Sequence, residues 1–210
     1  MRCKTCKEKF DQYEFNNKFC KKIDCQTAKA LFKLSLIKKQ DSKDWKERQT
    51  KMKESIGYTT KKPPKNVLQD EINKLVRVID NKFSHHCISC DTKSDTVQYA
   101  GGHRISVGAC ISIRYNLNDI HKQCNKRCNQ QLSGNPDGYD EGLIKRYGLE
   151  YKNYVKYELR KKYNYIDLGG LDYAVKIALV RKLIRDFDTF QLKDGIQARK
   201  LFNKIIGIYK

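Results

Sequence analysis

Nine cysteines, most of them in closely spaced pairs, constrain this chain more than any other feature. One group lies near the N-terminus and a second lies in the middle of the chain, while Cys110 stands outside both. A Cys-x2-Cys turn places two sulfurs on one side of an ion, and a second pair completes a tetrahedron of thiolates. The spacing therefore predicts two structural Zn²⁺ sites, one formed by Cys3, Cys6, Cys20 and Cys25, the other by Cys87, Cys90, Cys124 and Cys128.

The net charge of the chain indicates a polyanionic partner. Its 210 residues include 44 Lys and Arg against 24 Asp and Glu, a formal charge of +20. Such an excess favours nucleic acid, and two zinc modules argue against binding to a membrane surface. The basic excess is greatest in residues 1–65 and 140–210 and smallest in 66–139. We therefore expect phosphate-binding elements on both sides of a chemical centre.

The apolar residues exclude some locations for the protein. No run of about 18 apolar residues is present, which excludes a transmembrane helix. The N-terminal residues MRCKTCKEKF lack the apolar region of a secretion signal. The sequence therefore predicts a cytoplasmic protein, in the bacterial host cytoplasm if a phage encodes it, where paired thiols bind metal more often than they form disulfides.

Helical periodicity dominates the rest of the chain and predicts an α+β, mainly helical fold. Helix formers fill Thr27–Ile56, and the two prolines of Gly57–Asn66 predict a linker. Apolar residues then recur at helical spacing, namely Leu68, Ile72, Leu75, Val76, Ile79 and Phe83. We expect a zinc module at 1–27, a basic helix and linker at 28–65, a core at 66–138 and a helical region at 139–210.

Two short strands and several further helices are expected within these segments. Val97–His103 and the segment around Ile111–Tyr115 contain β-branched and aromatic residues, which predicts a hairpin between the halves of the second cysteine group. Gly148 is placed as a helix stop. The predicted C-terminal helices cover about 139–147, 150–163, 171–188 and 194–208.

The residues enclosed by the second cysteine group suit phosphodiester hydrolysis. His103 follows Ala100-Gly101-Gly102 on the first predicted strand, and Asn129 comes directly after Cys128. A neutral histidine near pH 7 can take a proton from water. A hard divalent ion can stabilise the charge on the phosphate and on the leaving oxygen. The ββα-metal (HNH) nuclease arrangement combines these parts, with a four-cysteine zinc clamp holding the hairpin to a helix.

The joined motifs resemble the phage NinG/Rap recombination proteins over about residues 1–35 and 85–160. The motifs are Cys87-Ile-Ser-Cys90, Ala-Gly-Gly-His103-Arg104, Asp-Ile-His121-Lys-Gln-Cys124, Cys128-Asn129, Leu132-Ser-Gly-Asn135, Tyr139 … Leu143-Ile-x-Arg146-x-Gly148 and the N-terminal cysteine group ending in Cys25-x-Thr27-Ala28. The resemblance implies a metal-dependent endonuclease that acts on branched recombination intermediates, such as Holliday junctions and D-loops. It also implies a catalytic Mg²⁺ or Mn²⁺.

The resemblance also implies roles for single residues. His103 becomes the general base and Asn129 a ligand of the catalytic ion, while Asp119 takes the position of the middle asparagine of an HNH motif. Many HNH enzymes carry an acidic metal ligand where this chain has Gly102, and His121 and Asp119 are the nearest replacements. The expected DNA contacts close to this site are Arg104, Arg114, Lys122, Lys126 and Arg127.

Two alternative functions stay open on the sequence. Gly102 and Asp119 depart from the nuclease pattern and favour a zinc-containing DNA-binding or regulatory protein without catalysis. An HNH nuclease that cuts DNA without preference for branches is the other. Because a four-way junction has two-fold symmetry, paired incisions favour a homodimer, and helices over about 171–208 are the expected contact.

Overall fold

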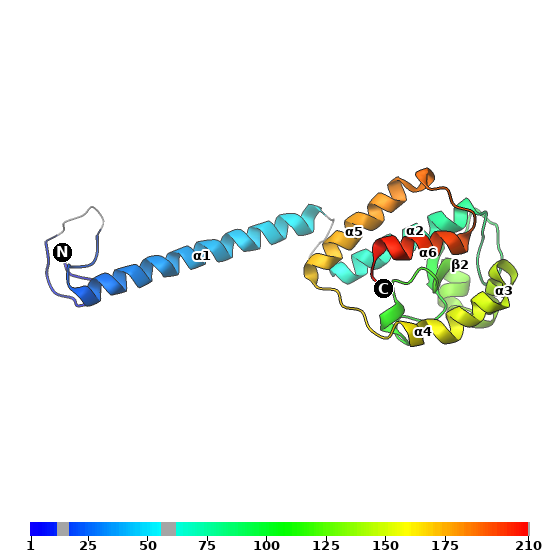
Figure 1. The fold of residues 1–210 in the computed structure, drawn as a ribbon, viewed down its shortest axis with the longest axis horizontal. Helices are drawn as coiled ribbons and strands as arrows, with labels where there is room; N and C mark the ends of the chain where they lie inside the picture. Colours follow the sequence, from blue (N-terminus) through cyan, green and yellow to red (C-terminus); the bar gives the residue numbers. More distant parts are fainter. Residues whose placement is uncertain (12–16, 56–61, 210) are drawn as a thin grey trace. The chain divides into compact units, whose positions relative to one another are not determined.

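The chain divides into two units, Met1–Ser55 and Ile56–Lys210. The computed structural model describes residues 1–11, 17–55 and 62–209, and Figure 1 shows the elements of each unit. Residues 57–61 of the predicted linker lie outside the described residues. The last part of the predicted linker was wrong, because Pro64–Asn66 belong to the next helix.

The first unit consists of an N-terminal cysteine region and the helix α1 (Ile23–Ser55). Neither Gly nor Pro interrupts this helix, which confirms the predicted helical segment. An antiparallel bridge joins Arg2 and Lys9 and forms the turn that carries the first cysteines. The apolar side chains of α1 are largely exposed, with Leu31 62% and Trp45 58% accessible, so its core is restricted to the cysteine region.

Helix α2 (Pro64–Lys82) is the centre of the second unit. Pro63 is its N-cap residue and Pro64 stands in its first turn, where the missing N–H leaves no helical bond unmade. The two prolines therefore begin a helix. The predicted apolar stripe is confirmed, since five of its six residues are fully buried, namely Leu68, Ile72, Leu75, Val76 and Ile79. They pack against α5 (Gly170–Arg185) and α6 (Gly195–Ile206).

A two-stranded antiparallel sheet packs on α2. Strand β1 (Tyr99–His103) pairs with β2 (Ile120–Cys124), so that Gly102 lies opposite His121 and His103 opposite Ile120. The prediction of the second strand was wrong. Ile111–Ile113 forms a 3-10 turn, η1, and the second strand begins nine residues after Ile111, at Ile120. Strand β2 is covered on both faces, so it lacks the alternation of polar and apolar residues that identifies a half-buried strand.

Short helical segments complete the unit. The π-helical turn η2 (Asn125–Gln131) follows β2, and α3 (Pro136–Asn153) is interrupted at Gly148, whose φ of +89° confirms the predicted helix stop. The remaining segments are η3 (Tyr154–Glu158), α4 (Leu159–Lys162) and η4 (Phe187–Thr189). The fold is thus mainly helical with one small sheet, as expected. Among the described helices, none combines the length and apolarity needed to cross a membrane.

Candidate metal and catalytic centre

The N-terminal cysteines converge on one point. The sulfurs of Cys3, Cys6, Cys20 and Cys25 all lie within 4.8 Å of one another. The Cys6 and Cys20 sulfurs are 3.7 Å apart, and the backbone N–H of Cys20 donates to the Cys3 sulfur over 3.3 Å. Burial and the neighbouring thiols raise the pKa of Cys25 to about 12. Four such thiols can lose their protons together only when a cation compensates their charge.

A second cluster joins three parts of the second unit. Cys87 and Cys90 come from the turn before β1, Cys124 ends β2, and Cys128 lies in η2. All four sulfurs again lie within 4.8 Å of one another, and those of Cys90 and Cys124 are 3.4 Å apart. Ligands in a zinc–thiolate tetrahedron are separated by about 3.8 Å. Both clusters could therefore hold zinc, and the second would fasten the sheet to η2.

We expect purified protein to contain two zinc ions per chain, and the Cys128→Ser variant to contain one. A serine hydroxyl is a much poorer zinc ligand than a thiolate, and a structural site needs all four. Elemental analysis of protein purified without chelators measures the content. Cys110→Ser is the matched control, because this cysteine belongs to neither cluster, and it should keep both ions. Fewer than two ions in the wild type would contradict the assignment.

His103 stands at the end of β1 with one ring nitrogen fixed. Its Nε2 lies 3.0 Å from the carbonyl oxygen of Arg114 and 3.5 Å from the amide nitrogen of Gln69. A carbonyl only accepts, so Nε2 carries the hydrogen and Nδ1 keeps its lone pair. Nδ1 has no hydrogen-bond partner in the part of the chain that the structure describes. Burial lowers the pKa of His103 below its ordinary value, so the ring is neutral near pH 7.

The loop that follows His103 is closed by Asp119. The carbonyl of Asp119 accepts from the Arg104 N–H over 2.8 Å, and its Oδ1 accepts from the Ile105 N–H over 2.9 Å. The side chain is fully buried, and burial raises the pKa of its carboxyl well above the usual value. Its Oδ2 lacks a hydrogen-bond partner among the described residues. Asp119 thus holds the two ends of the loop together as a buried group.

Helix α6 and the residues that follow it also hold this loop. The Leu117 N–H donates to Asn203 Oδ1 and the Tyr115 N–H to the Tyr209 hydroxyl, each over 3.1 Å. Arg199 Nε donates to the carbonyl of Leu117 over 3.1 Å. The backbone around Arg114, whose carbonyl fixes the His103 ring, is therefore secured by the C-terminal residues.

His121 lies on the other face of the sheet. Residues 103 and 121 have opposite orientations because Gly102, not His103, is the partner of His121. The ring is fully buried, and its Nδ1 is 3.0 Å from the hydroxyl of Tyr139, which donates to the Gly102 carbonyl over 2.8 Å. Burial lowers the pKa of His121 well below its ordinary value. Its Nε2 is buried without a partner in the described residues, so this histidine faces the interior and not a surface for DNA.

Asn129 lies on η2, which packs against both strands. It directly follows the fully buried zinc-cluster residue Cys128 and is itself only partly buried. Apart from the two cysteine clusters, no group of three His, Cys, Asp or Glu side chains converges within the described ranges. A carboxylate at position 102 would also collide with Gln123, whose side chain fills the space beside Gly102.

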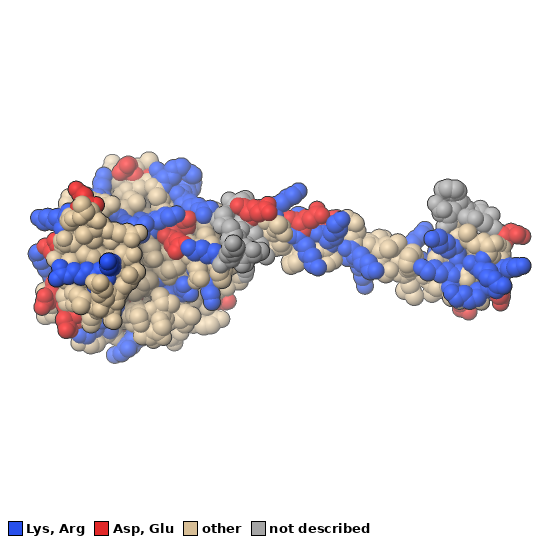
Figure 2. All heavy atoms as spheres, turned by 180° about the vertical axis from the view of Figure 1, so that it is seen from behind, with Lys and Arg blue, Asp and Glu red and all other residues tan. Residues whose placement is uncertain are grey.

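The five basic residues expected to contact DNA have different surroundings. Arg104 forms a bidentate ion pair with Asp140, and Arg114 donates to Gln69 Oε1 over 3.3 Å. Lys122 lies over the Tyr99 ring, 4.3 Å from its centre. The other two, Lys126 and Arg127, are exposed on η2. On the face shown in Figure 2, basic side chains gather on the N-terminal cysteine region and are scattered over the second unit with acidic ones between them.

Sequence reasoning missed a buried ion pair behind the sheet. Asp80 on α2 and Arg199 on α6 are both fully buried, with Arg199 Nη2 2.7 Å from Asp80 Oδ1. The other Asp80 oxygen accepts from the Lys122 N–H on β2 over 2.6 Å. Charged residues 119 positions apart carry no local signal of such a pair. Sequence reasoning also missed Gln69, which lies next to His103. Its position on α2, directly after Leu68 of the predicted apolar stripe, was a signal that could have identified it.

Comparison with known proteins finds one family. The family model described as "Bacteriophage Lambda NinG protein" matches residues 1–181. "Protein ninG" of Escherichia phage lambda is 39% identical over 82 residues, which are 39% of this chain and 38% of that protein. "Protein ninG" of Salmonella phage P22 is 37% identical over 81 residues, 39% of this chain and 38% of its own length. The matched segments thus span under two fifths of these relatives. No solved structure matches the chain.

Proposed function

Since the chain belongs to the NinG family of bacteriophage proteins, we propose that it is a metal-dependent endonuclease that cleaves branched DNA, such as Holliday junctions and D-loops. The observation that carries the proposal is the state of His103. Its Nε2 is fixed by the Arg114 carbonyl, and its Nδ1 keeps a lone pair without a protein partner among the described residues. A ring held in this tautomer is prepared to accept a proton.

The proposed reaction is hydrolysis of one phosphodiester bond. His103 Nδ1 takes a proton from a water molecule, and the water oxygen forms a bond to phosphorus. The bond between phosphorus and the 3′-oxygen breaks, and this oxygen leaves with the electron pair and is protonated by solvent. A neutral imidazole in the ground state is required for the first transfer, and the lowered pKa of His103 supplies it near pH 7.

The protein would supply only some of the ligands of a divalent ion at this site. The amide oxygen of Asn129 is a suitable ligand for Mg²⁺ or Mn²⁺, but Gly102 offers no carboxylate and His121 faces the interior. Mg²⁺ keeps several waters and often binds through few protein groups plus substrate phosphates. Once bound, such an ion would stabilise negative charge on the phosphate and leaving oxygen. We therefore propose that DNA oxygens supply most of its ligands.

The test is cleavage of matched DNA substrates by the full chain. A four-way junction, a fork and a linear duplex of equal length are incubated with Mg²⁺ or Mn²⁺, and products are separated on denaturing gels. We expect the junction and fork to be cut and the linear duplex to be cut much more slowly. Asn129→Ala should reduce cutting, whereas Gln130→Ala, an exposed neighbour on η2, should not.

Other outcomes identify the alternatives. Equal cutting of linear and branched DNA would indicate an HNH nuclease without branch selectivity. Binding without any cutting would indicate a zinc-containing DNA-binding protein, the reading favoured by the glycine at position 102. In that case the Gln123 side chain, which occupies the space beside Gly102, would explain why position 102 carries no acidic ligand.

We also propose that two copies act on one junction. The apolar sides of α5 and α6 are used within the chain, where Ile177, Val180 and Phe202 are buried, so contact through these helices would involve their outer faces. Light scattering on the protein alone and with a four-way junction measures the number of copies. A single copy in both states would contradict the proposal.

A further inference from the structure

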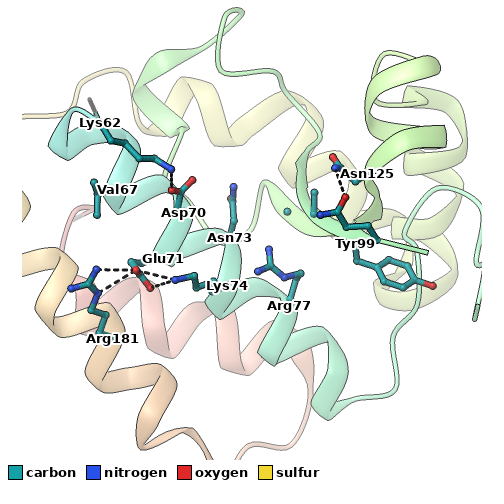
Figure 3. Close-up of a pocket in the computed structure, with 13 residues that line it drawn as sticks. Lys62, Val67, Asp70, Glu71, Asn73, Lys74, Arg77, Tyr99, Asn125 and Arg181 are labelled. Carbon is teal, nitrogen blue, oxygen red and sulfur yellow. Dashed lines mark hydrogen bonds and ion pairs between the residues drawn. The ribbon is translucent and has the colours of Figure 1, made fainter. Parts of the chain in front are cut away.

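A cavity of about 450 Å³ opens beside strand β1 on the same face as His103. Its walls come from α2, from β1, from the start of η2 and from α5, as Figure 3 shows. Tyr99 and Gly101 line it, and both share the face of His103 because side chains alternate along a strand. The cavity therefore reaches along the face of β1 to Gly101, two residues from the proposed catalytic histidine.

A row of polar side chains on α2 leads from His103 into this cavity. Gln69, Asn73 and Arg77 are four residues apart and so lie on one side of the helix. The Gln69 amide nitrogen is 3.5 Å from His103 Nε2 and donates to Asn73 Oδ1 over 3.0 Å. A Cβ at Gly101 would lie only 2.8 Å from Asn73 Oδ1, so the row passes close to the strand. Figure 3 shows Asn73 and Arg77 projecting from the same side of α2.

Of the four cations in the cavity wall, Arg77 is the one that forms no ion pair with the two carboxylates there. Glu71 accepts from Arg181 and from Lys74, each over 3.1 Å, and Asp70 is paired with Lys62. These two are the acidic residues of the cavity wall. Arg77 is half-buried, and its guanidinium makes no hydrogen bond to another described residue. Amide groups of Asn73, Gln98 and Asn125 surround the same space and can donate to an anion.

We propose that this cavity binds the backbone of the DNA strand being cut, with Arg77 contacting a phosphate next to the scissile one. The inference rests on the proposed function. Two residues of a strand span about 7 Å, so the cavity floor at Gly101 and Tyr99 is within one or two nucleotides of a phosphate at His103. The planar guanidinium can donate two parallel hydrogen bonds to phosphate oxygens. Such a contact positions the strand and carries no sequence preference.

The test is the salt dependence of DNA binding by three full-chain variants. Each is made with His103→Ala, and affinity for a four-way junction is measured by fluorescence anisotropy in Ca²⁺ between about 50 and 200 mM salt. Arg77→Gln should weaken binding about tenfold and reduce the slope of log K against log salt by about 1. Arg77→Lys should keep the slope, because it keeps the charge. Lys200→Gln, which removes one exposed charge from α6, should leave affinity and slope unchanged.

Wild-type affinity and slope in Arg77→Gln would overturn the inference, as would an equal loss in Lys200→Gln. Circular dichroism checks that each variant is folded. The outcome is separate from that of the proposed function, because binding is measured with a variant that cannot cut. A protein that never cuts DNA but loses affinity in Arg77→Gln would refute the nuclease and keep the phosphate contact. If the wild type cuts junctions and the Arg77→Gln variant binds DNA with unaltered affinity, the nuclease is supported and the phosphate contact is refuted.

Discussion

Cleavage of a four-way junction is expected to slow about 10²- to 10⁴-fold when His103 is replaced by alanine, while DNA affinity stays the same. Nδ1 has no hydrogen-bond partner in the described parts of the chain, and the variant removes this proton acceptor together with the hydrogen bond that Nε2 donates to the Arg114 carbonyl. Single-turnover rates at saturating protein measure the chemical step, and anisotropy measures the affinity. His86→Ala is the matched control, because this histidine lies outside β1 and makes no side-chain hydrogen bond to another described residue.

The pH dependence of the wild-type rate provides a second check on the same residue. A general base works only when unprotonated, so the rate falls as the pH drops through its pKa. Because burial lowers the pKa of His103, the acidic fall should have its midpoint below 6.5. A midpoint above that value, or unchanged cutting by His103→Ala, would refute the general-base assignment.

The Arg199→Met variant is expected to lose about 3–5 kcal/mol of unfolding free energy. Its guanidinium is the ion-pair partner of the fully buried Asp80, and methionine would leave that carboxyl group in the interior with His85 and the Lys122 N–H as its remaining partners among the described residues. Burial by itself raises the pKa of Asp80, but the charge of Arg199 and hydrogen bonds lower it overall. A lowered carboxyl pKa gives stability that is present above the unfolded value near 4 and is lost in stronger acid. Urea unfolding at pH 7 measures the difference.

Two controls make the stability result specific. Lys200→Met removes an exposed cation from the same helix and should change stability by less than about 0.5 kcal/mol. Adding Asp80→Asn to Arg199→Met should restore part of the loss, because the amide oxygen can still accept from the Lys122 N–H without a buried charge. A loss below about 1 kcal/mol in Arg199→Met would show that the pair contributes little.

Sequence reasoning succeeded where the signal is local. The spacing of Leu68, Ile72 and Leu75 predicted the central helix, and the Cys-x2-Cys turns predicted which thiols converge. It failed at β2, whose two covered faces remove the alternation on which strand prediction depends. The tautomer of His103 was also out of reach, because it depends on a carbonyl 11 residues away.

The hydrogen bonds between α6 and the loop before β2 affect how fragments of this protein should be chosen. The family model ends at residue 181, and a fragment cut there would keep every cysteine and both candidate catalytic residues. It would lose Asn203 and Tyr209, which hold the loop, and Arg199, which neutralises Asp80. Family resemblance therefore ends before the fold does. Changes in the least conspicuous part of the chain can alter the orientation of the histidine without touching any recognised motif.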